Sequence, residues 1–153
     1  MLAERGRGLG LKAGFLLAGG CDMIHAAPEY DLGITGVMKI AHFCEALGLD
    51  LQLHACGPAH RACMAAIRNT NYYELGLVHP KVPATRSVYL DYSDALDAVD
   101  ARGHVPVLQG PGLGAAIDWG YVRKNEVGVT VYQERACSPL VDGRCRCRPG
   151  NGL

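Results

Sequence analysis

Short apolar stretches followed by glycine or proline turns recur along residues 21–76, and this rhythm predicts three strand and helix units. Residues 21–26 form an apolar stretch that is short enough for a buried parallel strand. Residues 50–55 alternate apolar and polar side chains, which is typical of a strand with one buried face. Residues 72–75 have the aromatic character of a third strand. The predicted fold class is therefore α/β with parallel strands.

Two helices are predicted between these strands. Over residues 34–47 the apolar positions recur at intervals of three and four, so they share one helical face, and Gly48 is placed to end the helix. A second helix is expected to begin at residue 58 or 59, because proline suits the first turn of a helix, and to continue to Ile67.

The composition suits one hydrophobic core and indicates no strongly charged partner. The chain has 153 residues, 49% of them hydrophobic, which is enough for one ordinary domain. Its 15 basic and 15 acidic residues balance, so neither nucleic acid nor an anionic membrane surface is an expected partner. Residues 133–153 are rich in Arg, Cys, Gly and Pro without periodic apolar positions, which predicts a disordered tail.

The seven cysteines are expected to be mostly reduced core residues of a cytoplasmic protein, because their number is odd and their spacing is irregular. Cys137, Cys145 and Cys147 cluster near the end, but no histidine follows His104 to complete a zinc site. The apolar run at 13–18, preceded by basic residues, imitates a signal peptide imperfectly, so a secreted lipoprotein is the alternative. No stretch approaches the roughly 20 apolar residues of a membrane span.

His54 and Glu74 are candidates for acid and base chemistry. Each is predicted near the C-terminal end of a strand, where parallel α/β barrels carry their active-site residues. Histidine exchanges a proton near neutral pH, and a carboxylic acid with a raised pKa can hydrogen-bond developing negative charge. A lone histidine before a turn is more often structural, so the pattern alone leaves the catalytic role open.

An ordered set of motifs resembles the mandelate racemase and muconate-lactonizing branch of the enolase superfamily. In chain order the motifs are GITGVMKIA at 33–41, EALG at 45–48, His54, YE at 73–74, PGLG at 111–114 and Asp118. The first three look like the sixth and seventh βα units of that family, and the others fit its eighth strand and closing segment. The ordered combination is more specific than any single glycine motif.

This resemblance implies the C-terminal portion of a TIM-like (β/α)7β barrel, incomplete here, over residues 15–132, with residues 1–14 outside it. In such enzymes a base removes the proton alpha to a carboxylate and Mg²⁺ stabilises the enediolate. By analogy His54 is the seventh-strand general acid/base, and Glu74 is the eighth-strand acid that contacts the substrate carboxylate. The implied enzyme is a lyase (hydro-lyase) or isomerase acting on a small acid sugar.

The family's three magnesium carboxylates and its lysine base lie on earlier strands, and the sequence shows no counterparts for them. No metal ligand or cofactor-binding residue is therefore assigned, and the chain alone is expected to be inactive. The alternative is a non-catalytic remnant or self-associating interaction module. An incomplete barrel leaves open strand edges, so a homo-oligomeric or aggregation-prone chain is expected.

Several residues depart from the family pattern near the site. Ala27 stands where many members carry the aspartate that orients the catalytic histidine, and Glu29 or Asp31 is the alternative carboxylate. Leu32 replaces a glycine at a turn that requires positive φ, which predicts local strain. His25 is placed to project from the first strand near the pocket.

Overall fold

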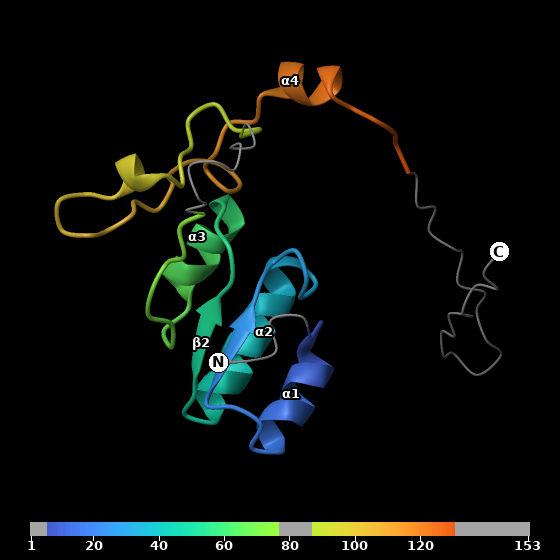
Figure 1. The fold of residues 1–153 in the computed structure, drawn as a ribbon, viewed down its shortest axis with the longest axis vertical. Helices are drawn as coiled ribbons and strands as arrows, with labels where there is room; N and C mark the ends of the chain where they lie inside the picture. Colours follow the sequence, from blue (N-terminus) through green and yellow to red (C-terminus); the bar gives the residue numbers. More distant parts are fainter. Residues whose placement is uncertain (1–5, 77–86, 131–153) are drawn as a thin grey trace, which may run out of the picture. The chain divides into compact units, whose positions relative to one another are not determined.

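The computed structural model describes residues 6–76 and 87–130, and helices and strands alternate along the first of these ranges (Figure 1). The chain divides into two compact units, Met1–Trp119 and Gly120–Leu153. The elements are α1 (Leu9–Leu17), β1 (Met23–Ala26), α2 (Gly33–Ala46), β2 (Asp50–Leu53), α3 (Pro58–Ala66), the 3₁₀ helix η1 (Leu96–Ala98) and α4 (Trp119–Lys124). The tail predicted at 133–153 lies outside the described residues.

Strands β1 and β2 form a parallel pair in which Ile24 lies opposite Leu51 and His25 lies opposite Gln52. Successive side chains of a strand point to opposite faces of the sheet. Ile24 and Leu51 therefore share one face, where both are completely buried. His25 and Gln52 share the other face, and His54, two residues beyond Gln52, belongs to that face as well.

Helix α2 packs against both strands, and it also contacts α1 and α3. Its buried positions are Gly36, Val37, Ile40, Ala41 and Cys44, which recur every three or four residues. The predicted strands at 21–26 and 50–55 and the predicted helices at 34–47 and 58–67 are confirmed, with ends that differ by no more than two residues. Gly48 follows α2 with a φ of 69°, which is the left-handed conformation expected after a helix end.

The third predicted strand, at residues 72–75, is wrong, because no strand forms at residues 71–76. Hydrogen bonds that involve side chains, and not a ladder of backbone hydrogen bonds, connect residues 71–76 to β2 and to the turn after β2. The Gln52 amide donates a hydrogen bond to the Tyr72 carbonyl, and the Tyr73 hydroxyl accepts one from the Gly57 backbone N–H. Tyr73, one of the aromatic residues that raised the strand propensity, therefore makes a tertiary contact with its side chain.

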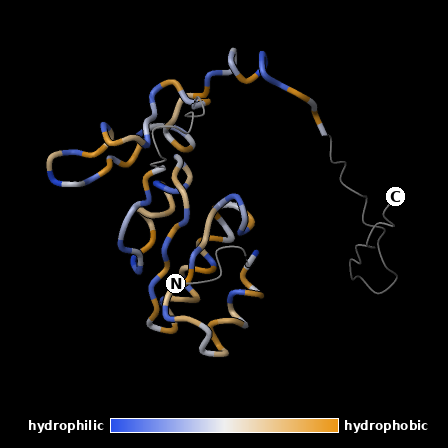
Figure 2. Tube along the Cα trace, viewed as in Figure 1, coloured by the Kyte–Doolittle hydropathy of each residue, from blue (hydrophilic) through white to orange (hydrophobic). Residues whose placement is uncertain are grey.

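The apolar run at 13–18 lies mostly within α1, a helix that the sequence pattern did not predict because Gly10 and Gly14 weaken it. This helix buries Leu16 in the core and buries Lys12 completely. Among residues 6–76 and 87–130, no helix is long and apolar enough to cross a membrane. Figure 2 shows hydrophobic positions interspersed with hydrophilic ones along the described trace.

The loop between β1 and α2 is tightly constrained. Leu32 has a φ of 65° and a ψ of 41°, a left-handed conformation that costs a non-glycine residue about 1–2 kcal/mol. The strain predicted at this position is confirmed. A Cβ atom on Gly36 would lie 1.5 Å from the Asp31 carbonyl oxygen, so only glycine lets α2 pack this closely against the loop.

Four cysteines of the described residues are free thiols. Cys44 and Cys63 are buried, as predicted for core residues, and Cys21 and Cys56 are half-buried. Burial raises the pKa of Cys44 to about 11. Burial, together with the Glu29 carboxylate, raises the pKa of Cys63 as well. The other three cysteines lie outside the described residues.

The family-like motif at 111–114 forms a turn in which Gly112 and Gly114 both have positive φ, at 65° and 70°. An antiparallel bridge between Tyr89 and Ile117 connects the two ends of residues 87–119. These residues form irregular structure with one short 3₁₀ helix.

Candidate active site

His54 and Glu74 meet at the C-terminal end of the parallel pair. The His54 backbone N–H donates to the Ala26 carbonyl at 2.9 Å, which continues the ladder one residue beyond β2. Ala55 then turns the chain with a φ of 68°. The Glu74 Oε2 atom accepts a hydrogen bond from the Ala55 N–H at 3.0 Å and lies 3.3 Å from the His54 Nδ1 atom. The two side chains are 31% and 41% exposed, so a solute can reach both.

The ring of His25 stacks on the ring of His54, with centroids 5.7 Å apart and an interplanar angle of 24°. This geometry is within the range of offset aromatic stacking. Because His25 lies opposite Gln52 in the neighbouring strand, the two histidines are diagonal neighbours on one face. The structure thus places two imidazoles and one carboxylate, that of Glu74, in contact at this end of the sheet.

The Asp31 carboxylate is completely buried, and the Nζ atom of Lys12 lies 2.7 Å from its Oδ2 atom. Asp31 also accepts hydrogen bonds from the backbone N–H groups of Gly8 and Ala27, both at 2.9 Å. The Lys12 ammonium in addition donates to the His25 carbonyl oxygen at 2.5 Å. This pair ties α1 to the end of β1, and no sequence pattern indicated it, because lysine is almost never fully buried.

Glu29, the other loop carboxylate expected as a substitute, lies beside His60 in α3. Its Oε2 atom is 3.2 Å from the His60 Nε2 atom, although the contact lacks hydrogen-bond geometry. His60 is completely buried, and neither of its ring nitrogens has a hydrogen-bond partner among the described residues. Asp31 and Glu29 are thus engaged elsewhere, and the carboxylate that the structure places beside His54 is that of Glu74.

An aromatic and charged cluster holds the segment that carries Glu74. The Tyr73 hydroxyl donates to the Asp94 Oδ1 atom at 2.6 Å, and the Arg61 guanidinium pairs with the same oxygen at 2.9 Å. The guanidinium also lies over the rings of Tyr73 and Tyr92, 5.3 and 4.4 Å from their centroids. Burial and the hydrogen bond to Asp94 raise the pKa of Tyr73, so its hydroxyl remains a donor. No local sequence pattern indicated this cluster.

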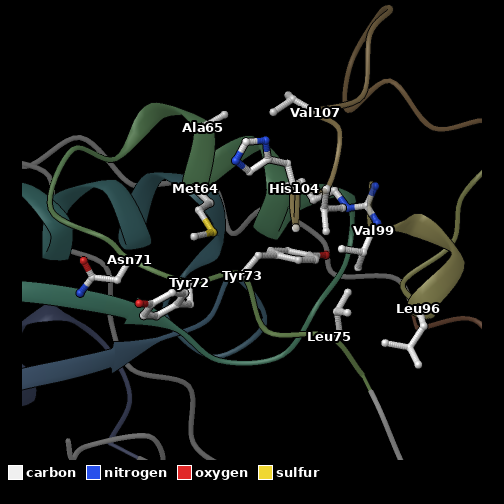
Figure 3. A pocket seen from close by; sticks show the side chains of 13 residues that line it. Met64, Ala65, Asn71, Tyr72, Tyr73, Leu75, Leu96, Val99, His104 and Val107 are labelled. Atoms are coloured by element: carbon white, nitrogen blue, oxygen red, sulfur yellow. The ribbon is translucent and has the colours of Figure 1, made fainter. Parts of the chain in front are cut away.

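A cavity of about 800 Å³ opens beside α3, and Figure 3 shows Tyr73 in the middle of its lining. The lining is mainly apolar and includes Met64, Leu75 and Leu96. His54 and Glu74 are not among the lining residues. Tyr73 and Leu75 face the cavity, whereas Glu74 between them reaches the turn after β2. The cavity is therefore lined by neighbours of Glu74 in the segment 71–76 and not by the His54–Glu74 pair itself.

The donor set around His54 does not fit a magnesium ion. Mg²⁺ requires near-octahedral oxygen ligands, and Glu74, the carboxylate at this position, already accepts the Ala55 N–H. Within the part of the chain that the structure describes, no group of three or more His, Cys, Asp or Glu side chains could hold a metal ion. The inability of the chain to bind magnesium by itself stays a prediction.

Comparisons with known proteins connect this geometry to a family. The family model described as enolase C-terminal domain-like matches residues 1–121. Among solved structures, D-glucarate dehydratase from Agrobacterium tumefaciens, in complex with magnesium, is similar at a TM-score of 0.62 and 32% sequence identity. The match covers 76% of this chain and 30% of the dehydratase chain. No curated protein matches.

Proposed function

The chain belongs to the enolase superfamily, as a C-terminal domain of the mandelate racemase and muconate-lactonizing branch, and from this premise we propose that His54 and Glu74 are part of the proton-transfer site of an acid-sugar dehydratase or racemase. The observation that carries the proposal is the 3.3 Å contact between the His54 Nδ1 and Glu74 Oε2 atoms at the end of β2. The similarity to D-glucarate dehydratase supports an arrangement of β1, α2, β2 and α3 as consecutive units of a (β/α)7β barrel.

In this proposal His54 is the general acid/base. Its Nδ1 atom faces a carboxylate, so the proton alpha to the substrate carboxylate would be exchanged with the other ring nitrogen, Nε2. The Glu74 carboxylate stabilises the imidazolium that forms when His54 accepts the proton. The partial exposure of Glu74 supports its second expected role, which is contact with the substrate carboxylate.

Magnesium stabilises the enediolate in the reaction type that the family implies. Because the described residues do not provide an oxygen-ligand set, no step of this proposal passes through the metal. We expect the 153-residue chain alone to be inactive, because the negative charge of the enediolate would lack its main stabilising partner.

Proton NMR in D₂O tests both parts of the proposal. D-Glucarate, an acid sugar, is expected to shift the imidazole resonances of His54, whereas glucose, which lacks a carboxylate, is not. Exchange of alpha protons by the chain is expected to stay at the level of the His54→Asn variant, with or without magnesium. Absence of any His54 shift would overturn the site assignment, and exchange that needs both magnesium and His54 would overturn the inactivity.

A non-catalytic, self-associating module is the second candidate function. The observation that favours it is the exposure of large apolar side chains: Leu32 is 83% exposed, Tyr72 80%, Leu17 70% and Leu96 68%. Sedimentation velocity over a range of concentrations is expected to show dimers or larger species. A compact monomer that unfolds cooperatively at every concentration would count against this candidate.

A further inference from the structure

His25 and Glu74 contact the proposed acid/base, His54, from two different directions. The His25 ring is stacked on the ring of His54 in an offset arrangement, with centroids 5.7 Å apart and an interplanar angle of 24°. Glu74 approaches the edge of the same His54 ring, at Nδ1. The carboxylate and the His25 ring therefore restrain His54 in two different directions.

The position of His25 is itself firmly held. Its relative exposure is 9%, and its carbonyl oxygen accepts a hydrogen bond from the buried Lys12 ammonium. Lys12 pairs with Asp31, which in turn accepts the N–H of Ala27 at the residue after β1. A buried ion pair thus fixes the strand end that carries His25, and buried charge pairs of this kind resist local displacement because separating them is costly.

We propose that His25 is a positioning residue for His54, and that its ring fixes the plane of the His54 imidazole so that Nδ1 stays directed at Glu74. The proposal rests on the function proposed above for His54. It assigns a use to the buried imidazole of His25 and to the Lys12–Asp31 pair that supports it, neither of which takes part in proton transfer.

The torsions of a histidine side chain show why two restraints are needed. Rotation about the Cβ–Cγ bond is broad, and it exchanges the positions of the Nδ1 and Cδ2 atoms. An edge contact with one carboxylate oxygen directs a single atom and leaves the tilt of the ring free. A nearly parallel ring stacked on the imidazole restricts that tilt, so the contacts with His25 and Glu74 together restrain the orientation of the ring.

The loop after β1 does not place its carboxylates beside His54. Ala27 has no polar side chain with which to orient His54. The two acidic residues of the loop are engaged elsewhere, since Asp31 pairs with Lys12 and Glu29 lies beside His60. The stacked His25 ring gives His54 a support that these two carboxylates do not give.

The test is the tautomer of His54, measured by long-range ¹H–¹⁵N NMR on the full chain labelled with ¹⁵N-histidine, at a pH where the imidazole is neutral. In the natural protein His54 is expected to carry its proton on Nδ1, facing Glu74. The His25→Phe variant keeps a flat ring and is expected to keep this tautomer. The His25→Gln variant keeps similar bulk without a ring and is expected to lose it.

The control is Met23→Ala, which removes a side chain from the same strand and the same sheet face that is not one of the two stacked rings. It is expected to leave the tautomer unchanged. Each variant is checked for folding by thermal unfolding, and His25→Leu, with the same expected loss, replaces His25→Gln if that variant is unfolded. If the phenylalanine and ring-free variants both keep the Nδ1–H tautomer, or both lose it, the proposal is overturned.

The measurement needs no substrate and no turnover. If sugar acids did not bind, the proposed function would be ruled out, but the tautomer measurement would still test the role of His25. Conversely, loss of the tautomer in both His25 variants would overturn the positioning role while His54 could still bind an acid sugar. The two proposals can therefore fail separately.

Discussion

Replacement of Lys12 by methionine is expected to lower the free energy of unfolding by about 3 kcal/mol, because it leaves the buried Asp31 carboxylate without its cation. The two side chains are 1% and 0% exposed, and the Nζ and Oδ2 atoms are 2.7 Å apart. Removing one partner of a buried pair costs about 3–5 kcal/mol. The lower end applies here, because the backbone N–H groups of Gly8 and Ala27 continue to donate to Asp31.

Thermal and urea unfolding, followed by circular dichroism, measure this loss. In a chain of this length, 3 kcal/mol lowers the Tm by roughly 6–12 °C. Methionine keeps most of the volume of the lysine stem, so the change reports on the charge and its hydrogen bonds more than on packing. The matched control is Arg68→Met. Arg68 is 87% exposed and lies 3.9 Å from Glu45, so its loss is expected to cost less than about 1 kcal/mol.

A double variant tests the physical reason. Lys12→Met combined with Asp31→Asn leaves no buried charge, and the asparagine side chain can still accept a backbone N–H. The double variant is therefore expected to be more stable than Lys12→Met alone. A loss below about 1 kcal/mol for Lys12→Met, or a double variant no more stable than the single one, would refute the reasoning.

Two further predictions concern stability. Leu32→Gly is expected to raise the free energy of unfolding by about 0.5–1 kcal/mol, because glycine removes the left-handed strain and the Leu32 side chain is 83% exposed. Urea unfolding measures this gain. The control variant Leu32→Ala keeps the strain and should show no gain. Burial raises the pKa of the Cys44 thiol from 9.0 to about 11, so the unfolded chain loses this proton at a lower pH than the folded chain does. The stability that this group contributes is therefore complete below pH 9. It is lost between pH 9 and 11, by about 1.4 kcal/mol per pH unit. Unfolding as a function of pH checks this, and an equally steep decline in Cys44→Ala would contradict it.

The sequence alone determined the elements whose signals are local. The spacing of apolar residues in α2 and the alternation in β2 record which side of each element is buried, and both predictions are confirmed. His54 and Glu74 were both identified as site candidates near the ends of predicted strands, and the structure brings them to 3.3 Å, although the strand predicted for Glu74 does not form. Their catalytic roles stay a prediction. The strain at Leu32 was also predictable, because a turn that needs positive φ is a property of a few consecutive residues.

Tertiary structure alone decided which distant side chains pair. The segment 71–76 carries the residues of a strand, yet its contacts with Gln52 and Gly57 are made by side chains, so no ladder forms. Lys12 has the local surroundings of a solvent-exposed lysine, but the packing of α1 places it against Asp31 and buries both charges. Local periodicity records that a face is buried, whereas the partner of a buried charge depends on how separate elements pack, and no pattern within one element contains that information.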